Sequence, residues 1–159
     1  MDEKKKHLKT FKAFLDERKK AESTRAEKPV DWEARKNNWL KSVDNLYSIV
    51  DQVIVKSFED SGFKVTKTKE TVRLSEEYIG TYSIDNYYIK ADTIQIKFFP
   101  IGTIIIGASG RVNMVLPSET IKLVLQDWNT WKIVSGLSSS MRLVDFNEEN
   151  IVKLFQENV

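Results

Sequence analysis

The sequence predicts an α+β fold, with N-terminal helices followed by an antiparallel β meander of about seven to nine strands in a strongly curved sheet that a C-terminal helix closes. Before Gly62, apolar residues recur every three or four positions, at Trp32, Trp39, Leu40, Val43, Leu46, Tyr47, Val50 and Ile54. After Gly62 they alternate at every second position, as in 94–98 and 121–125. The first period indicates a helix with one buried face, and the second indicates half-buried strands. Short turns between the strands favour antiparallel pairing, because parallel neighbours need long crossovers.

Charge divides the chain into two parts. The chain has 159 residues, which is the size of one domain. Residues 1–28 hold ten lysines and arginines against six acids, whereas the remainder is slightly acidic. Residues 23–29 are typical of a linker, and Pro29 ends it as a helix breaker. We therefore expect a basic helical arm with a linker over 1–28 and a single α+β domain over 29–159.

Three helices are predicted. Residues 3–22 form the first; its apolar stripe is only two turns long, so it has to dock on its own domain or on a partner. Residues 32–60 form the second, which Asp31 caps and Gly62 terminates. The β-branched residues at 53–55 weaken this helix, and we expect a break or kink there. The last helix begins at Asp145 or Asn147 and buries Phe146, Ile151, Val152, Leu154 and Phe155.

Alternation and turn chemistry place nine short strands between the second and the last helix. The segment 102–107 is apolar on both faces, which is typical of a central strand covered on both sides. Asn129 and Thr130 suggest a two-residue hairpin loop, in which Trp128 and Trp131 face each other. The nine strands are expected at 63–67, 71–75, 79–84, 86–91, 93–99, 102–107, 111–116, 120–126 and 131–135.

Several function classes are excluded by composition. The chain has no cysteine, which excludes disulfides, thiolate zinc sites and a cysteine nucleophile and agrees with a reducing cytosol. Its single histidine, His7, excludes a histidine metal cluster and argues against a catalytic triad. The N-terminus lacks the apolar core of a secretory signal, and the longest apolar run, 104–108, is too short to span a membrane. We expect a cytoplasmic protein with no cofactor and no membrane contact, although carboxylates alone still permit a magnesium site.

One pattern is similar to the metal site of a nuclease superfamily. Asp85 is followed by Gln95 and Lys97, an acid…(Glu/Gln)-x-Lys spacing in which carboxylates hold magnesium and the lysine positions or activates water. Strand alternation places Gln95 and Lys97 on the same face. Two features count against the site: a glutamine replaces the usual second acid, and the residues between Asp85 and Gln95 are typical of strands rather than of crossover helices.

The candidate binding residues are aromatic or basic. Tyrosines on the strands stack bases or anchor a protein partner if they face solvent, and they fill a half-buried sheet if they do not. Arg111 follows a glycine-bearing turn, where an arginine beside free backbone N–H groups can hold a carboxylate or phosphate. The basic arm is the third candidate. The residues are Tyr78, Tyr82, Tyr87, Tyr88, Arg111, Lys4, Lys5, Lys6, Lys9 and Lys12.

The leading hypothesis is a small non-catalytic cytoplasmic binding protein, of an accessory, adaptor or immunity type, that acts through a protein partner. It rests on the scarcity of catalytic residues, the docking helix of the arm and the aromatic strands. The alternative is a nucleic-acid-binding protein that uses the basic arm and the aromatic sheet face. A magnesium-dependent nuclease using Asp85, Gln95 and Lys97 is the third hypothesis. Homo-oligomerisation stays open.

Overall fold

The computed structural model describes residues 10–19, 30–103, 108–136 and 141–159, in two separate units, 1–31 and 32–159. In the first unit, residues 10–19 are helical and expose the apolar side chains of Phe11, Phe14 and Leu15. Lys12 is exposed on the same helix, whereas Lys4, Lys5, Lys6 and Lys9 lie outside the described residues.

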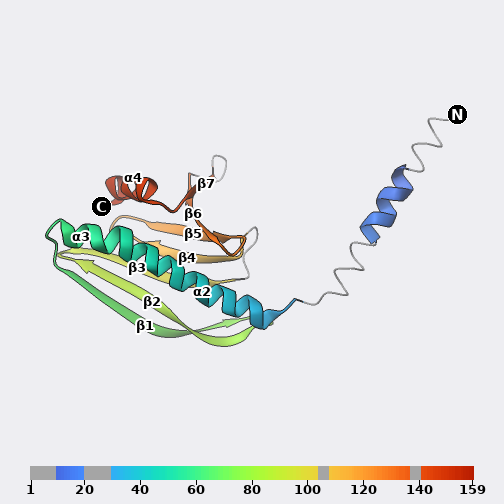
Figure 1. The fold of residues 1–159 in the computed structure, drawn as a ribbon, viewed down its shortest axis with the longest axis horizontal. Coiled ribbons are helices and arrows are strands. Elements are labelled where there is room, and N and C mark those ends of the chain that lie inside the picture. The colour runs from blue at the N-terminus through green and yellow to red at the C-terminus, as the bar shows by residue number, and fades with distance from the viewer. Residues whose placement is uncertain (1–9, 20–29, 104–107, 137–140) are drawn as a thin grey trace. The chain divides into compact units, whose positions relative to one another are not determined.

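In the second unit, a helical run over 32–60 lies across one face of the sheet (Figure 1). It comprises α2 (Trp32–Val50), the π-helical segment η1 (Asp51–Val55) and α3 (Lys56–Asp60). The run ends at Gly62, whose φ of 86° is favourable for glycine and whose N–H donates to the Glu59 carbonyl at 3.0 Å. The expected helix is confirmed, and the expected irregularity at 53–55 is the π-helical turn. No helix among the described residues is both long and apolar enough to cross a bilayer.

Seven antiparallel strands follow in sequence order and form one open sheet, which confirms the α+β meander. Each neighbouring pair is antiparallel. After the last strand, α4 (Glu148–Asn158) closes the chain and begins at Asn147, one of the two expected caps. The strands are β1 (Val65–Glu76), β2 (Gly80–Ala91), β3 (Ile94–Gly102), β4 (Gly110–Val115), β5 (Thr120–Gln126), β6 (Thr130–Ser135) and β7 (Arg142–Asp145).

Several strand bounds differ from the prediction. The four strands expected over 63–91 are two long ones, because β1 and β2 pair without interruption from Val65↔Ala91 to Glu76↔Gly80. The strand β7 is additional to the predicted strands. Its four residues show no alternation signal, and they pair only with β6. The strand expected at 102–107 is not described beyond Thr103.

The expected two-residue hairpin at Asn129 and Thr130 is wrong. Gln126 pairs with Thr130, so the loop spans 127–129, and Trp128 occupies it with a φ of 63°. The Trp128 ring lies 5.4 Å from the Arg35 guanidinium, whereas Trp131 is buried in the core. The two indoles therefore do not form the expected facing pair, because Trp128 packs against α2.

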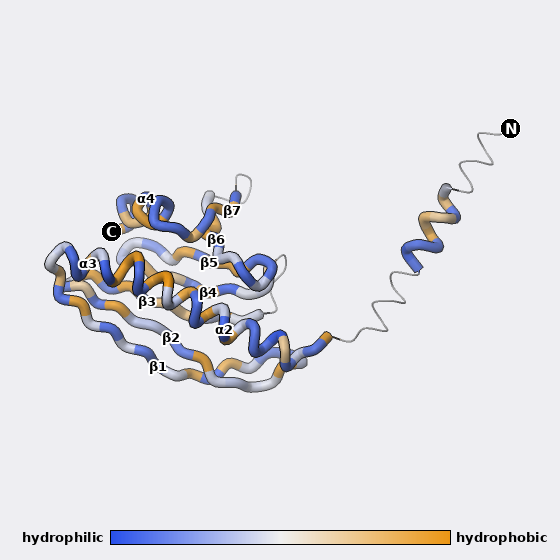
Figure 2. Tube along the Cα trace, in the orientation of Figure 1, coloured by the Kyte–Doolittle hydropathy of each residue, from blue (hydrophilic) through white to orange (hydrophobic). Residues whose placement is uncertain are grey.

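The hydrophobic core lies between the helical run and the face of the sheet that it covers. Hydropathy varies along the strands (Figure 2), and the buried apolar strand residues form one cluster with those of the helices. The largest fully buried side chains come from both layers: Trp39, Leu46 and Tyr47 from α2, and Tyr87, Ile89, Ile96, Phe98, Met114, Leu123, Leu125 and Ile133 from the sheet. This burial leaves the opposite face of the sheet outside the core.

The sheet divides between β2 and β3. These strands pair only over Tyr87–Ala91 and Ile94–Phe98, so the first half of β2 is bonded to β1 alone. At this fork the buried positions of β2 change from Tyr82 and Ile84 to Tyr87 and Ile89. Backbone groups away from water need hydrogen-bond partners. Where β3 does not pair with β2, the Tyr47 hydroxyl donates to the Asp85 carbonyl at 2.6 Å.

A polar network around Glu76 joins the strands at the fork to α2. The Thr103 N–H donates to Glu76 Oε1 at 2.7 Å, and the Arg35 Nη2 donates to the Thr103 carbonyl at 2.5 Å. The Tyr82 hydroxyl donates to the other Glu76 oxygen. The Arg35 guanidinium also lies 5.8 Å from the Trp32 ring. One carboxylate thus links β1, β2 and the end of β3 to α2.

Candidate binding groove

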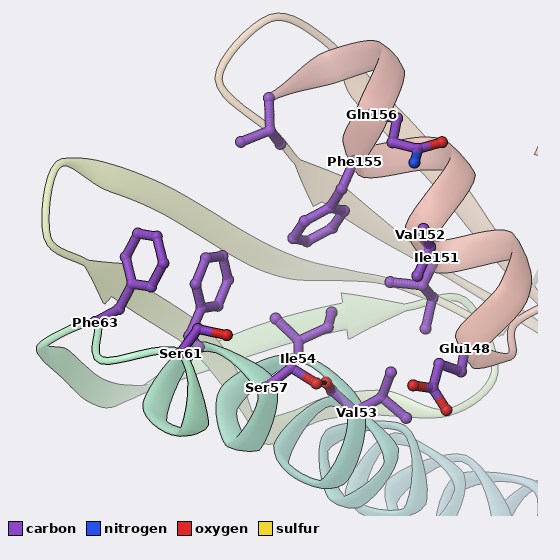
Figure 3. A pocket seen from close by; sticks show the side chains of 12 residues that line it. Val53, Ile54, Ser57, Ser61, Phe63, Glu148, Ile151, Val152, Phe155 and Gln156 are labelled. Atoms are coloured by element: carbon purple, nitrogen blue, oxygen red, sulfur yellow. Dashed lines mark hydrogen bonds between the residues drawn. The ribbon is translucent and has the colours of Figure 1, made fainter.

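An open apolar groove separates α3 from α4 and has a volume of about 390 Å³ (Figure 3). The side chains of Ile54 and Phe63 point into it from one wall, and those of Ile151 and Phe155 point into it from the other. Volumes of about 300–1,000 Å³ are typical of ligand sites in proteins. The groove is therefore large enough to receive apolar side chains of a partner.

The α3 wall depends on the π-helical turn. A π turn inserts one residue into the helix, and here Ile54 and Val55 are both buried in succession. From the π-helical segment onward, residues four apart line the groove: Val53, Ser57 and Ser61. The Tyr87 hydroxyl on β2 donates to the Asp51 carboxylate at the start of the π turn. This bond holds the wall against the sheet.

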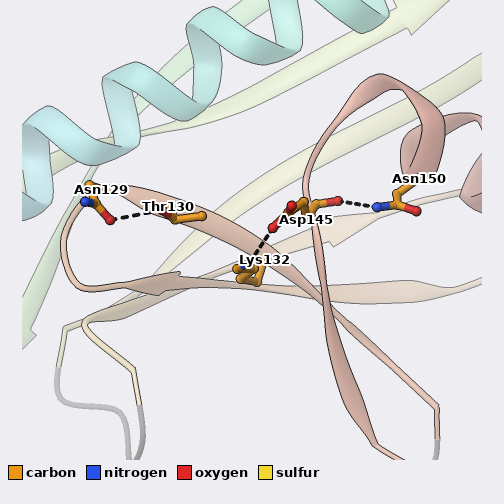
Figure 4. Close-up of polar contacts among 5 residues, drawn as sticks. All are labelled: Asn129, Thr130, Lys132, Asp145 and Asn150. Atoms are coloured by element: carbon orange, nitrogen blue, oxygen red, sulfur yellow. Dashed lines mark hydrogen bonds and ion pairs between the residues drawn. The ribbon is translucent and has the colours of Figure 1, made fainter.

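The α4 wall is held by polar contacts at its N-terminus (Figure 4). Asn147 caps the helix, accepting the Asn150 N–H at 3.0 Å. The Asn150 amide in turn donates to the Asp145 carbonyl at 2.9 Å, and the Asp145 carboxylate pairs with Lys132 on β6. The direction of α4 is therefore set by β6 and β7.

Aromatic rings fill the floor between the two walls. The Phe58 ring lies 5.1 Å from the Phe63 ring in an edge-on arrangement and 6.2 Å from the Phe155 ring. At the rim, Val152 is 48% exposed, although the sequence pattern predicted it to be buried. Its side chain lines the groove rather than the core, so it offers apolar surface to a partner.

The two helices that form the walls are acidic. Their residues include five acids, Glu59, Asp60, Glu148, Glu149 and Glu157, against Lys56 and Lys153. Lys153 already pairs with Glu149 at 3.6 Å. Glu148 itself lines the groove. The apolar groove therefore lies in a negative environment.

The tyrosines predicted to form a binding platform are divided between the core and the surface. Tyr82 and Tyr87 are buried and donate hydrogen bonds to Glu76 and Asp51. Tyr78 is 70% exposed in the β1–β2 turn and stacks on Trp32, with ring centroids 5.1 Å apart. Tyr88 lies on the other face of the sheet. The four tyrosines therefore form no common surface.

The remaining sequence candidates also lie apart. Arg111 is half-buried on β4, where its Nε donates to the Asn113 amide oxygen at 3.0 Å. Asp85 accepts a hydrogen bond from the Thr71 hydroxyl at 2.7 Å, whereas Lys97 pairs with Tyr88 in the β2–β3 register. Within the described ranges, no group of three or more acids or histidines is arranged to hold a metal ion.

Burial raises the pKa of three core tyrosines, Tyr47, Tyr82 and Tyr87, well above the usual value of about 10. A nearby carboxylate adds to the effect in each case, from Asp85, Glu76 and Asp51 respectively. A negative neighbour and an apolar surround both disfavour the charged phenolate. These phenols therefore stay protonated in the folded chain at a pH where they ionise in the unfolded chain.

Alkaline pH should therefore destabilise the protein. Below about pH 10 the folded and unfolded states both keep these phenol protons, and the stabilisation is complete. Above about pH 10 the unfolded state binds fewer protons than the folded state. The free energy of unfolding therefore falls as pH rises. We expect the urea midpoint to fall over this range, and Tyr87→Phe to reduce the slope. Phenolate absorbance that shows all the tyrosines ionising near pH 10 without unfolding would contradict the prediction.

Comparison of the chain with protein-family models, with curated proteins and with solved structures found no match. The groove residues Ile151, Val152 and Phe155 on α4 were predicted to be buried in the core, and no motif marked them as a site. The sequence feature that came closest to marking the groove was the β-branched segment at 53–55, where the π turn forms.

Proposed function

We propose that this is a binding protein whose groove between α3 and α4 receives the apolar face of an amphipathic helix from a protein partner. The observation that carries the proposal is an open apolar groove between two acidic helices. Helix-in-groove recognition uses apolar anchors at positions i, i+3, i+4 and i+7 of the bound helix. The cysteine-free composition supports a reducing compartment such as the cytosol for this binding.

The chemistry of the groove favours a basic helix over other apolar occupants. A fatty acid would fill the apolar floor but would place its carboxylate near Glu148 and the other acids of the walls. A helix with lysines or arginines beside its apolar face satisfies both features, because opposite charges across an interface attract and guide association. The exposed rim residue Val152 would contact the apolar face of such a helix.

Two synthetic helical peptides test the proposal. They share one apolar face and are about four turns long, and one carries lysines where the other carries glutamates. We expect the basic peptide to bind the full-length protein in fluorescence anisotropy and to lose affinity with added salt. Val152→Asp should weaken binding at least about tenfold, because it buries a carboxylate against the apolar face of the peptide.

The control variant is Asn37→Asp, which adds the same charge at an exposed position of α2 away from the groove. It should bind the basic peptide as the wild type does. Equal affinity for both peptides, or full binding by Val152→Asp, would refute the proposal. A fluorescent fatty acid that binds while neither peptide does would show that the groove serves a small molecule.

A further inference from the structure

The outer face of the sheet, opposite the core, carries the strand residues that alternate with the buried ones. This face begins at Thr66, Thr68 and Glu70 from β1, continues through Tyr88 and Lys90 from β2, and ends at Leu143 and Asp145 from β7. The helical run over 32–60 and α4 pack on the other face. Between these limits the outer face comprises Gln95, Lys97, Phe99, Ile101, Arg111, Asn113, Val115, Thr120, Lys122, Val124, Gln126, Thr130, Lys132 and Val134.

Positive charge collects on the outer face, although the sequence after residue 28 is slightly acidic. Five cations lie there, and Lys132 is neutralised by Asp145. Glu70 on β1 is an acid on the same face, and it accepts a hydrogen bond from the Tyr88 hydroxyl at 3.0 Å. Among the described residues, no acid pairs with the remaining four cations: Lys90, Lys97, Arg111 and Lys122.

The sheet register arranges these four cations as a band. Lys97 and Lys122 are two strands apart, because Lys97 pairs with Val115 and Lys122 pairs with Asn113 on the intervening strand β4. Arg111 lies opposite Val124, two residues along β5 from Lys122. Strand spacing and rise place neighbouring cations about 8–12 Å apart. Long lysine and arginine side chains at this spacing can reach separate phosphates of an extended polyanion.

A hollow of about 250 Å³ adjoins the band at Tyr88 and Lys97. Gln95 and Thr68 line it with polar groups, and the Tyr88 ring meets the Phe99 ring edge-on at 5.9 Å. A hollow with an aromatic wall, amide and hydroxyl groups and adjacent lysines has the features that bind a nucleic-acid base beside its phosphate.

We propose that the outer face binds single-stranded nucleic acid, with its phosphates along Lys90, Lys97, Arg111 and Lys122 and a base in the hollow beside Tyr88. A single strand fits better than a duplex because its bases are free to stack on an aromatic side chain. The proposal concerns a different surface from the groove, and we expect Val152→Asp to leave binding to the outer face unchanged.

Labelled oligothymidine and the full-length protein test the charge band. The double variant Lys97→Glu/Lys122→Glu should reduce affinity more than about tenfold and lower the slope of log affinity against log salt by about 1.4. The matched control is Lys41→Glu/Lys56→Glu, which makes the same charge change on exposed positions of α2 and α3. The control should bind within about twofold of the wild type, since its lysines lie off the outer face.

Two further measurements test the base contact. Tyr88→Leu should weaken oligothymidine binding about fivefold or more and leave heparin, a polyanion without bases, unaffected. No binding by the wild type at low salt would overturn the proposal, as would unchanged binding by the Lys97→Glu/Lys122→Glu variant. Two results would overturn it in favour of another anionic partner. One is tighter binding to phosphatidylserine vesicles than to oligothymidine. The other is a loss of heparin binding by Tyr88→Leu that equals its loss of oligothymidine binding.

Discussion

Gly110→Ala is expected to lower the free energy of unfolding by about 3 kcal/mol or more, because the new methyl group has no room. A Cβ at this position would lie 2.3 Å from Trp39 Cζ3 and 2.6 Å from its Cε3. Trp39 is fully buried, and its ring also packs against Trp131 at 6.2 Å. A rigid indole in a closed core cannot move aside cheaply, so α2 must shift away from the sheet.

Urea and thermal denaturation measure this effect, and we expect the melting temperature to fall by about 6–12 °C. Gly80→Ala is the control, since Gly80 has a φ of 89° but its Cβ would meet nothing within 4 Å. That variant carries only the backbone strain of a left-handed alanine, about 1 kcal/mol. Equal destabilisation by the two variants would show that the contact with Trp39 is not responsible.

Glu76→Ala is expected to cost about 3 kcal/mol, because it removes an acceptor on which three donors of the described residues converge. The Thr103 N–H and hydroxyl lie 2.7 Å and 3.1 Å from Glu76 Oε1, and the Tyr82 hydroxyl bonds the second oxygen. Thr103 and Tyr82 are buried, so their donors lose their partner without gaining full hydration. The ends of β1, β2 and β3 should then separate at the fork.

Glu77→Ala is the matched control, because Glu77 is the exposed residue that follows Glu76 in the chain. It should change the free energy of unfolding by less than about 0.5 kcal/mol. Hydrogen exchange provides a second readout: the Thr103 amide should lose protection in Glu76→Ala while amides on β5 keep theirs. Retained protection at Thr103 together with full stability would contradict this role of the network.

The two proposed binding surfaces follow from one architectural feature. The helical run covers a single face of the sheet, so α3 and α4 meet at one end of the core and leave a groove, while the other face keeps its polar side chains. The groove walls carry five acids and the outer face carries five cations. Opposite charge on separate surfaces predicts partners of different chemistry, and the salt dependence of each can be measured independently.

Local sequence patterns predicted much of this fold. The run of apolar residues from Trp32 to Ile54 has helical spacing, and alternation over 94–98 and 121–125 has strand spacing. These signals are local, because each residue's burial depends on the period of its own segment. The β-branched residues 53–55 also predicted an irregularity in the helix, which is the π turn. In contrast, β7 has four residues, and its place in the sheet depends on β6.

The face on which a tyrosine lies could not be predicted in the same way. Tyr82 and Tyr87 are five residues apart and both buried, which strict alternation forbids. The strand changes its buried face at the fork, where β2 loses its neighbour β3 and gains contacts from α2. That change depends on the packing of a helix about forty residues away, so it left no local signal.

From its residues alone, the chain specified an α+β meander, the long helix over 32–60 and the absence of thiol chemistry, because periodicity and composition are properties of neighbouring residues. The groove, the buried network at Glu76 and the cation band on the outer face arise from residues far apart in the sequence. Their positions depend on how the helices pack on the sheet. Because their residues are far apart in the sequence, no local pattern could predict them.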